Sequence, residues 1–234
     1  MQQITSNIYQ ISLGSVNTFL IDDNGLTLID SGSKNNADKI FKAIVKGGKN
    51  PNNIKRIILT HCHPDHAGSA AEIKKRLNIP IWAHGEDASL IEKGIAVRSP
   101  MHRTPGIVNW LVYNIFIKPT GSTIEAVKVD ERLKDNDILP VAGGVEVIHT
   151  PGHCAGHVAL LVKDEGVLIA GDICAHVGGL GVSTVNEDAA LSIKSILKAA
   201  SFSFSTALFG HGSPLKAAAN TKLKQKFTPL TAAL

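Results

Sequence analysis

The N-terminal third of the chain alternates short apolar runs with polar turns. The runs span residues 4–13, 16–22 and 26–30, and Gly14-Ser15 and Asp23-Asn24-Gly25 separate them. β-rich runs joined by short turns are typical of antiparallel strands. The pattern therefore predicts a meander whose second and third strands form a hairpin.

Helical periodicity begins at residue 37. Apolar side chains recur at helical spacing over residues 37–45, and Gly47-Gly48 predicts the end of that helix. A buried strand at residues 56–60, a helix at 70–77 and a strand at 81–83 follow. Because two strands joined through a helix pair in parallel, this region predicts a parallel part of a sheet.

Residues 86–120 are less regular, and we interpret them as an insertion. Within it, residues 106–117 form the longest apolar stretch, which is shorter than the ~20 residues that a membrane-spanning helix needs. The stretch is apolar all round, so something must cover it. Three interpretations stay open: burial in the domain, a lid over a hydrophobic substrate, and a homodimer contact.

The C-terminal half again changes from strands to helices. Strands are expected at residues 125–129, 144–149, 157–163 and 167–170, a helix at 187–200, a strand at 206–209 and a helix at 214–226. We expect residues 1–234 to form a single domain of mixed α and β structure.

The composition is that of a globular protein, with 44% hydrophobic and 19% charged residues. The formal net charge is +4, but no basic run exceeds three residues, so nucleic acid is not an expected partner. The polar start lacks the features of a signal peptide, and three cysteines are too few for a disulfide framework. We therefore expect a cytoplasmic protein that acts on a small molecule.

A histidine cluster follows the predicted strand at residues 56–60. It reads HCHPDH and places four candidate ligands within six positions: His61, His63, Asp65 and His66. Imidazole and carboxylate groups suit Zn²⁺. A loop at a strand end presents His61 and His63 to one ion, and it turns Asp65 and His66 toward a second position nearby.

Three later residues complete the candidate ligands, each in a glycine-flanked turn after an apolar run. They are His153 in TPGHCAGH, Asp172 in AGD and His211 in GHG. One zinc ion takes four or five ligands, so seven candidates favour two ions, and the two oxygens of Asp172 suit a bridge between them. Each of the three cysteines lies within two positions of a predicted ligand, where we interpret it as filling space.

In this order, HCHPDH, TPGHCAGH, AGD and GHG resemble the motifs of the metallo-β-lactamase-fold hydrolase superfamily, with a glyoxalase II-like ligand pattern, over roughly residues 1–220. The resemblance implies a four-layer αββα sandwich with a dinuclear site along one edge of its two sheets. It also implies a first ligand set of His61, His63 and His153, a second ligand set of Asp65, His66 and His211, and Asp172 as the bridge. Asp30, in LIDSGS, matches a family Asp that accepts hydrogen bonds and orients the ligand loop.

The same motifs separate branches of the family. β-Lactamases of this fold lack an Asp at the position of Asp172, which disfavours that activity. Glyoxalase II carries a helical extension for glutathione, whereas only residues 212–234 follow His211 here. The lactonases place a Tyr between the third-His and last-His motifs, and no Tyr follows Tyr113. The tRNA nucleases need a long basic arm, and the sequence contains none.

We predict a metal-dependent hydrolase in which a hydroxide generated between two metals attacks a small ester, thioester or lactone. Asp65 is the catalytic carboxylate that orients this hydroxide. The expected cofactor is Zn²⁺, two per chain, and iron or manganese suit the same ligands. Two alternatives stay open: a persulfide dioxygenase with one iron on residues matching His61, His153 and Asp172, and a phosphodiesterase or nuclease of the same fold.

Overall fold

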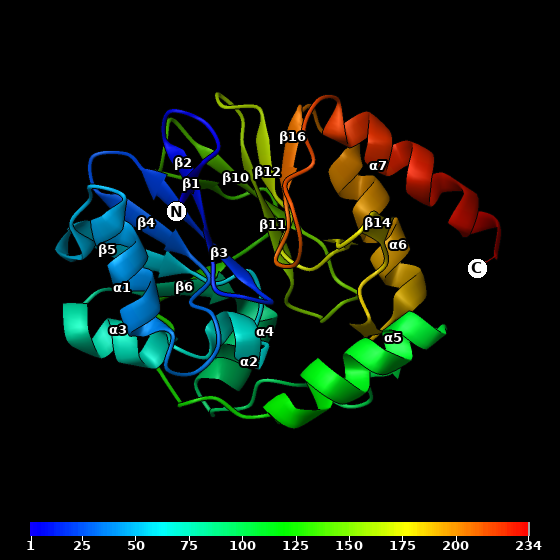
Figure 1. The fold of residues 1–234 in the computed structure, drawn as a ribbon, viewed down its shortest axis with the longest axis horizontal. Coiled ribbons are helices and arrows are strands. Elements are labelled where there is room, and N and C mark those ends of the chain that lie inside the picture. The colour runs from blue at the N-terminus through cyan, green and yellow to red at the C-terminus, as the bar shows by residue number, and fades with distance from the viewer. Residues whose placement is uncertain (234) are drawn as a thin grey trace.

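A computed structural model describes residues 1–233, so the last residue of the predicted domain, residue 234, lies outside the described residues. The two sheets lie face to face between two groups of helices. Figure 1 shows α1 and α3 on one side and α6 and α7 on the other, with the strands between them. The predicted four-layer αββα arrangement is confirmed.

The larger sheet comes from the N-terminal half, with strands in the order β1, β2, β3, β4, β5, β6, β8. Their bounds are Gln2–Gln3, Ile8–Ser12, Asn17–Asp22, Leu26–Ile29, Ile54–Ile58, Ile81–His84 and Glu131–Leu133. Strands β2, β3 and β4 pair antiparallel, and β4, β5, β6 and β8 pair in parallel. Both the meander and the parallel region are thus confirmed.

The smaller sheet comes from the C-terminal half, with strands in the order β16, β12, β11, β10, β9. In chain order their bounds are Ile138–Leu139 (β9), Val145–His149 (β10), Val158–Val162 (β11), Val167–Ile169 (β12) and Thr206–Leu208 (β16). Two short pairs lie outside the sheets: β13 (Ala175–His176) with β14 (Leu180–Gly181), and β7 (His102–Arg103) with β15 (Val185–Asn186).

The longer helices cover the outer faces of the sheets. The α-helices are α1 (Ala37–Lys46), α2 (Pro64–Ala67), α3 (Ala70–Leu77), α4 (Gly85–Ile91), α5 (Ile107–Val112), α6 (Ala189–Ala200) and α7 (Ala219–Phe227). Shorter turns lie at Pro51–Asn53, Tyr113–Ile117, Lys118–Thr120 and Thr228–Ala233. Helix α4 falls in the segment expected to be irregular, yet its Ala88 and Ile91 are fully buried.

Two of the predicted elements are wrong in their position. Residues 125–129 contain no strand in the described part of the chain, because Val127 N donates to Ile91 O and Val129 N to Glu92 Oε1 at the end of α4. The final helix begins at Ala219 rather than at residue 214, because Leu215 pairs with Ala207 through two backbone hydrogen bonds of 2.9 Å.

Alternating side chains on the strands divide the core into three layers. On β5, Ile57 packs with the helices outside the larger sheet, and Ile58 packs between the sheets. On β11, Leu161 packs beneath α6 and α7, and Leu160 packs between the sheets. Successive side chains of a strand point to opposite faces, so each sheet is apolar on both faces, as a four-layer sandwich requires.

Strand direction brings the candidate ligands to one edge. In the larger sheet β4 and β5 run in parallel, and in the smaller sheet β10, β12 and β16 share one direction. Asp30 follows β4, and the histidine cluster follows β5. The loops that contain His153, Asp172 and His211 follow β10, β12 and β16.

Candidate metal centre

The cluster HCHPDH is divided between a loop and one helical turn. His61 and His63 lie in the loop after β5, and Pro64 begins the short helix α2. A proline fits at the first helical position because it has no N–H to leave unpaired. The turn then places Asp65 and His66 on α2, and His66 N and Ala67 N both donate to His63 O. The two pairs stay close, since the ring centroids of His61 and His66 lie 4.1 Å apart.

The structure brings all seven predicted ligands together. Their ligand atoms form three overlapping groups with internal separations within 4.8 Å: His61, His63 and His153; His61, His66 and Asp172; and Asp65, His66 and His211. The first and third groups coincide with the first and second ligand sets, and the remaining group joins the two sets through Asp172.

Asp172 lies close to histidines of both predicted ligand sets. Its Oδ2 lies 3.1 Å from His211 Nε2 and 3.8 Å from His153 Nε2, while its Oδ1 lies 3.5 Å from His66 Nε2. Its main chain is also held, because Asp172 N donates to His157 Nε2 at 2.9 Å. Ser183 Oγ donates to Asp172 O at 2.6 Å. His157, which the sequence analysis did not count as a ligand, therefore fixes the position of the bridging residue.

Hydrogen bonds to the other ring nitrogen orient three of the histidines. His153 Nδ1 lies 2.8 Å from Val185 O, and His211 Nδ1 lies 2.6 Å from Ser15 O. Because a carbonyl can only accept, both rings must carry the proton on Nδ1 and turn Nε2 toward the cluster. His66 Nδ1 makes the corresponding contact with Asp30 Oδ2 at 2.8 Å.

Asp30 holds the start of the ligand loop as well as His66. Its Oδ1 accepts from Thr60 N at 2.7 Å, and its Oδ2 accepts from Thr60 Oγ1 at 2.8 Å. Thr60 Oγ1 in turn lies 3.0 Å from His61 Nδ1. Asp30 adopts a φ of +62°, which is uncommon for a residue other than glycine and is found where the surroundings impose it. These contacts agree with the orienting role that the resemblance implies for Asp30.

Unpaired buried atoms show that the cluster fits a cation. Among the described residues, His61 Nε2, His66 Nε2 and Asp172 Oδ1 are buried without a hydrogen-bond partner. Buried polar atoms in native structures nearly always have partners, since an unpaired one costs free energy. The same three residues form one of the groups whose ligand atoms lie within 4.8 Å of one another. A bound cation would satisfy them together.

The histidines of the first ligand set are neutral near pH 7. Burial lowers the pKa of His63 to about 4 and that of His153 to about 3. Burial also lowers the pKa of His61 well below its usual value. A neutral imidazole has a free lone pair, so these three rings are ready to bind a cation without losing a proton.

The second ligand set is internally ion-paired. Burial opposes the charged form of His66, but Asp172 and Asp65 raise its pKa well above the usual value, and the same two carboxylates raise the pKa of His211. Burial would raise the pKa of Asp65 and Asp172, yet His66 and His211 lower both. The two histidines therefore hold protons that a cation would have to replace.

One buried carboxylate in this region escaped the sequence analysis. Asp87, in the first turn of α4, accepts hydrogen bonds from Cys62 N and Gly156 N in the two loops that contain the first ligand set. In the sequence it looks like an ordinary acidic residue at a helix start, so no local signal marks it.

The apolar segment at residues 107–116 is exposed. The exposed fraction is 72% for Ile107, 47% for Trp110 and 55% for Phe116, so the interpretation that the domain buries this segment is wrong. The start of the segment and the residues before it contact the chain shortly after Asp172, because Thr104 Oγ1 donates to Ser183 O and Thr184 Oγ1 donates to Asn109 Oδ1.

Within residues 1–233, no helix has the length and apolar character needed to span a membrane.

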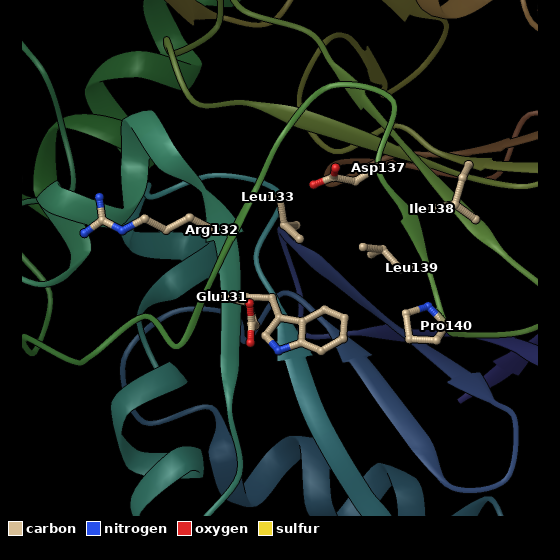
Figure 2. A pocket seen from close by; sticks show the side chains of 8 residues that line it. Glu131, Arg132, Leu133, Asp137, Ile138, Leu139 and Pro140 are labelled. Atoms are coloured by element: carbon tan, nitrogen blue, oxygen red, sulfur yellow. The ribbon is translucent and has the colours of Figure 1, made fainter.

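One surface hollow shares no residue with the histidine cluster and has a different chemistry. Figure 2 shows it where the edge strands β8 and β9 face each other, with Leu133 on one side and Leu139 on the other, and Trp82 also lines it. Glu131 and Asp137 supply its acidic groups. Its lining residues contain neither histidine nor cysteine, so the hollow lacks the ligands that the sheet edge provides.

Comparisons with known proteins agree on the family to which the chain belongs. The model of the family described as "Metallo-beta-lactamase superfamily" matches residues 11–211. The chain is 30% identical over 163 residues to the probable metallo-hydrolase YqgX of Bacillus subtilis, an alignment that covers 70% of this chain and 67% of that protein. It is 25% identical over 161 residues to the hydroxyacylglutathione hydrolase GloC of Haemophilus influenzae, covering 68% of this chain and 66% of that protein.

Solved structures agree on the architecture. The metallo-β-lactamase MIM-1 from Novosphingobium pentaromativorans has a TM-score of 0.74 at 19% identity, with 99% of this chain and 88% of that chain covered. The subclass B3 enzyme BJP-1 of Bradyrhizobium japonicum has a TM-score of 0.71 at 23% identity, with 99% and 91% covered. At these identities the likeness shows the fold alone.

Proposed function

The chain belongs to the metallo-beta-lactamase superfamily, and from that premise we propose that it hydrolyses a small ester, thioester or lactone with two zinc ions. His61, His63 and His153 would hold one ion, Asp65, His66 and His211 the other, and Asp172 would contact both. The observation that carries the proposal is the convergence of these seven side chains, with buried ring and carboxylate atoms that lack partners among the described residues.

Two bound cations would lower the pKa of a water molecule between them toward neutrality and polarise the carbonyl group of the substrate. The protein then needs no serine or cysteine nucleophile. Asp65 is ionised, because His66 and His211 lower its pKa, and its side chain is 30% exposed. A partly exposed carboxylate in this position can accept a hydrogen bond from the attacking water and orient it toward the substrate.

The relatives support the substrate class only in part. One of them bears the name hydroxyacylglutathione hydrolase, which keeps a thioester among the candidates. At 25% identity, the name of that relative does not carry its substrate over to this chain. We therefore propose the class of acyl substrates and no single member of it.

Metal analysis of the purified protein, together with a panel of lactones, thioesters, carboxylic esters and bis(p-nitrophenyl) phosphate, tests the proposal. We expect two zinc ions per chain and faster turnover of an acyl substrate than of the phosphodiester. One iron per chain with oxygen consumption in the presence of a persulfide would contradict it in favour of a dioxygenase. Faster turnover of the phosphodiester would contradict it in favour of a phosphodiesterase.

A further inference from the structure

Asp87 is a buried carboxylate that contacts both loops of the first ligand set. Its exposed fraction is 1%. Asp87 Oδ2 accepts from Cys62 N at 2.9 Å, and Asp87 Oδ1 accepts from Gly156 N at 3.0 Å. Cys62 lies between His61 and His63, and Gly156 lies three residues after His153. One side chain therefore joins the loop after β5 to the loop after β10.

The surroundings of Asp87 admit a carboxylate and little else. A third donor, Cys154 Sγ, lies 3.3 Å from Asp87 Oδ2. A Cβ atom added at Gly156 would lie 2.3 Å from Asp87 Cγ, so the close approach of the His153 loop to Asp87 requires glycine there. Two backbone donors and one thiol donor stabilise a charge that would otherwise be costly to bury.

The joined loops come from different sheets, and the backbone hydrogen bond between them, from Val158 N to Thr60 O at 2.9 Å, lies outside the segments that contain the first ligand set. Within the first ligand set, His63 Nδ1 lies 2.9 Å from His153 Nε2. This contact is a hydrogen bond between two rings that are neutral near pH 7, so it lacks the added strength of a charge-assisted bond. Asp87 supplies a connection on the protein side of these rings that is present before any cation binds.

We propose that Asp87 is a positioning residue that holds the loop of His61 and His63 against the loop of His153, and thereby sets the affinity of the first ligand set for its cation. This inference rests on the ligand sets of the proposed function. Asp30 contacts the second ligand set directly through His66, whereas it reaches the first set only through Thr60, whose hydroxyl lies 3.0 Å from His61 Nδ1.

The test is a zinc titration of the metal-free full chain against a chromophoric chelator, with ¹⁵N-labelled histidine rings reporting which set fills. In Asp87→Asn one acceptor oxygen is replaced by an NH₂ group that faces backbone N–H donors. We expect the first ligand set to lose about 10- to 100-fold in zinc affinity, the range typical of residues that orient metal ligands, while the second set is unchanged. Asp30→Asn should weaken the second set more than the first, because Asp30 contacts His66 directly and His61 only through Thr60.

Asp130→Asn is the matched control, because Asp130 Oδ2 also accepts a backbone hydrogen bond, from Ile81 N at 2.9 Å, away from the ligand loops. Cys154→Ala, which removes only the thiol donor, should have a smaller effect than Asp87→Asn. Cys62→Ala keeps the backbone N–H and should likewise have a smaller effect than Asp87→Asn.

Equal weakening of both sets, or wild-type affinity in a folded Asp87→Asn protein, would overturn the role of Asp87. If the wild-type protein itself binds no zinc, the proposed function fails instead. Hydrogen exchange on the metal-free wild type tests the same contacts without a variant. Slow exchange of the Cys62 and Gly156 amides is expected, and fast exchange of either would refute the preformed connection.

Discussion

The two halves of the chain contribute to the metal centre in different ways. The N-terminal half supplies four candidate ligands within the six residues 61–66, on one loop and one helical turn. The C-terminal half supplies three, His153, Asp172 and His211, from the ends of three separate strands. The first group depends mainly on local geometry, whereas the second group depends on the pairing and direction of β10, β12 and β16.

The contacts that orient the ligands differ in the same way. In the N-terminal half the carboxylate of Asp30 contacts His66 and Thr60. The two histidines of the C-terminal half are held by main-chain carbonyls instead, His153 by Val185 O and His211 by Ser15 O. Because a carbonyl is present in every residue, such contacts leave no trace in the sequence. The comparison teaches that the C-terminal ligands are placed by backbone geometry more than by particular partner residues.

The largest effect is expected at Asp172, the side chain that lies near both ligand sets. Asp172→Ala removes contacts within 3.8 Å of His66, His153 and His211. We expect the zinc content to fall from two ions per chain to one or fewer. Loss of a residue that only orients a ligand lowers activity by up to about 100-fold, and we expect kcat/KM to fall by more than that. Metal analysis and kinetics on an ester substrate provide the measurement. The control is Asp38→Ala, which removes an exposed carboxylate paired with Arg76. Full metal occupancy and unchanged turnover in Asp172→Ala would refute the dinuclear proposal.

The second prediction separates the two ligand sets by their protons. The raised pKa values of His66 and His211 mean that zinc must displace protons from the second set, so its affinity should rise about tenfold per pH unit for each proton displaced. The pKa values of about 4 for His63 and about 3 for His153 predict no such dependence for the first set between pH 5 and 8. Calorimetric titration in two buffers of different ionisation enthalpy counts the protons. Equal release by both sets would contradict the distinction.

The smallest effect on stability is expected outside both groups of ligands, in the exposed segment around α5. Trp110→Ser should change the free energy of unfolding by less than about 0.5 kcal/mol, whereas Leu208→Ala, in the core between the sheets, should cost about 2–5 kcal/mol. Chemical denaturation measures both values. A loss above about 2 kcal/mol in Trp110→Ser would show that the segment is buried after all.

The same variant distinguishes the two interpretations that stay open for this segment. If it is a lid, Trp110→Ser should raise KM for long-chain esters and leave short-chain esters unchanged. If it is a homodimer contact, sedimentation should show a dimer in the wild type and a monomer in the variant.

Much of the fold could be predicted because its signals are local. Helix α3 has the predicted bounds of residues 70–77, and the antiparallel strands β2, β3 and β4 follow from the turns between them. The predictions were wrong where the backbone of a segment makes hydrogen bonds to residues distant in the sequence. Residues 125–129 are apolar enough for a strand, but the end of α4 takes up two of their N–H groups. Residues 214–218 are held by the bridge between Leu215 and Ala207.

The residue types and order in HCHPDH and in the glycine-flanked turns of His153, Asp172 and His211 predict which kinds of side chain form the candidate site and roughly how many. The packed molecule was needed to show which atoms face one another, that Asp87 joins two loops of candidate ligands, and that the segment at residues 107–116 is exposed. Side-chain periodicity and turn chemistry depend on residues that are near one another in the sequence. A hydrogen bond between loops of different sheets forms only after both sheets have packed, so the sequence pattern does not reveal it.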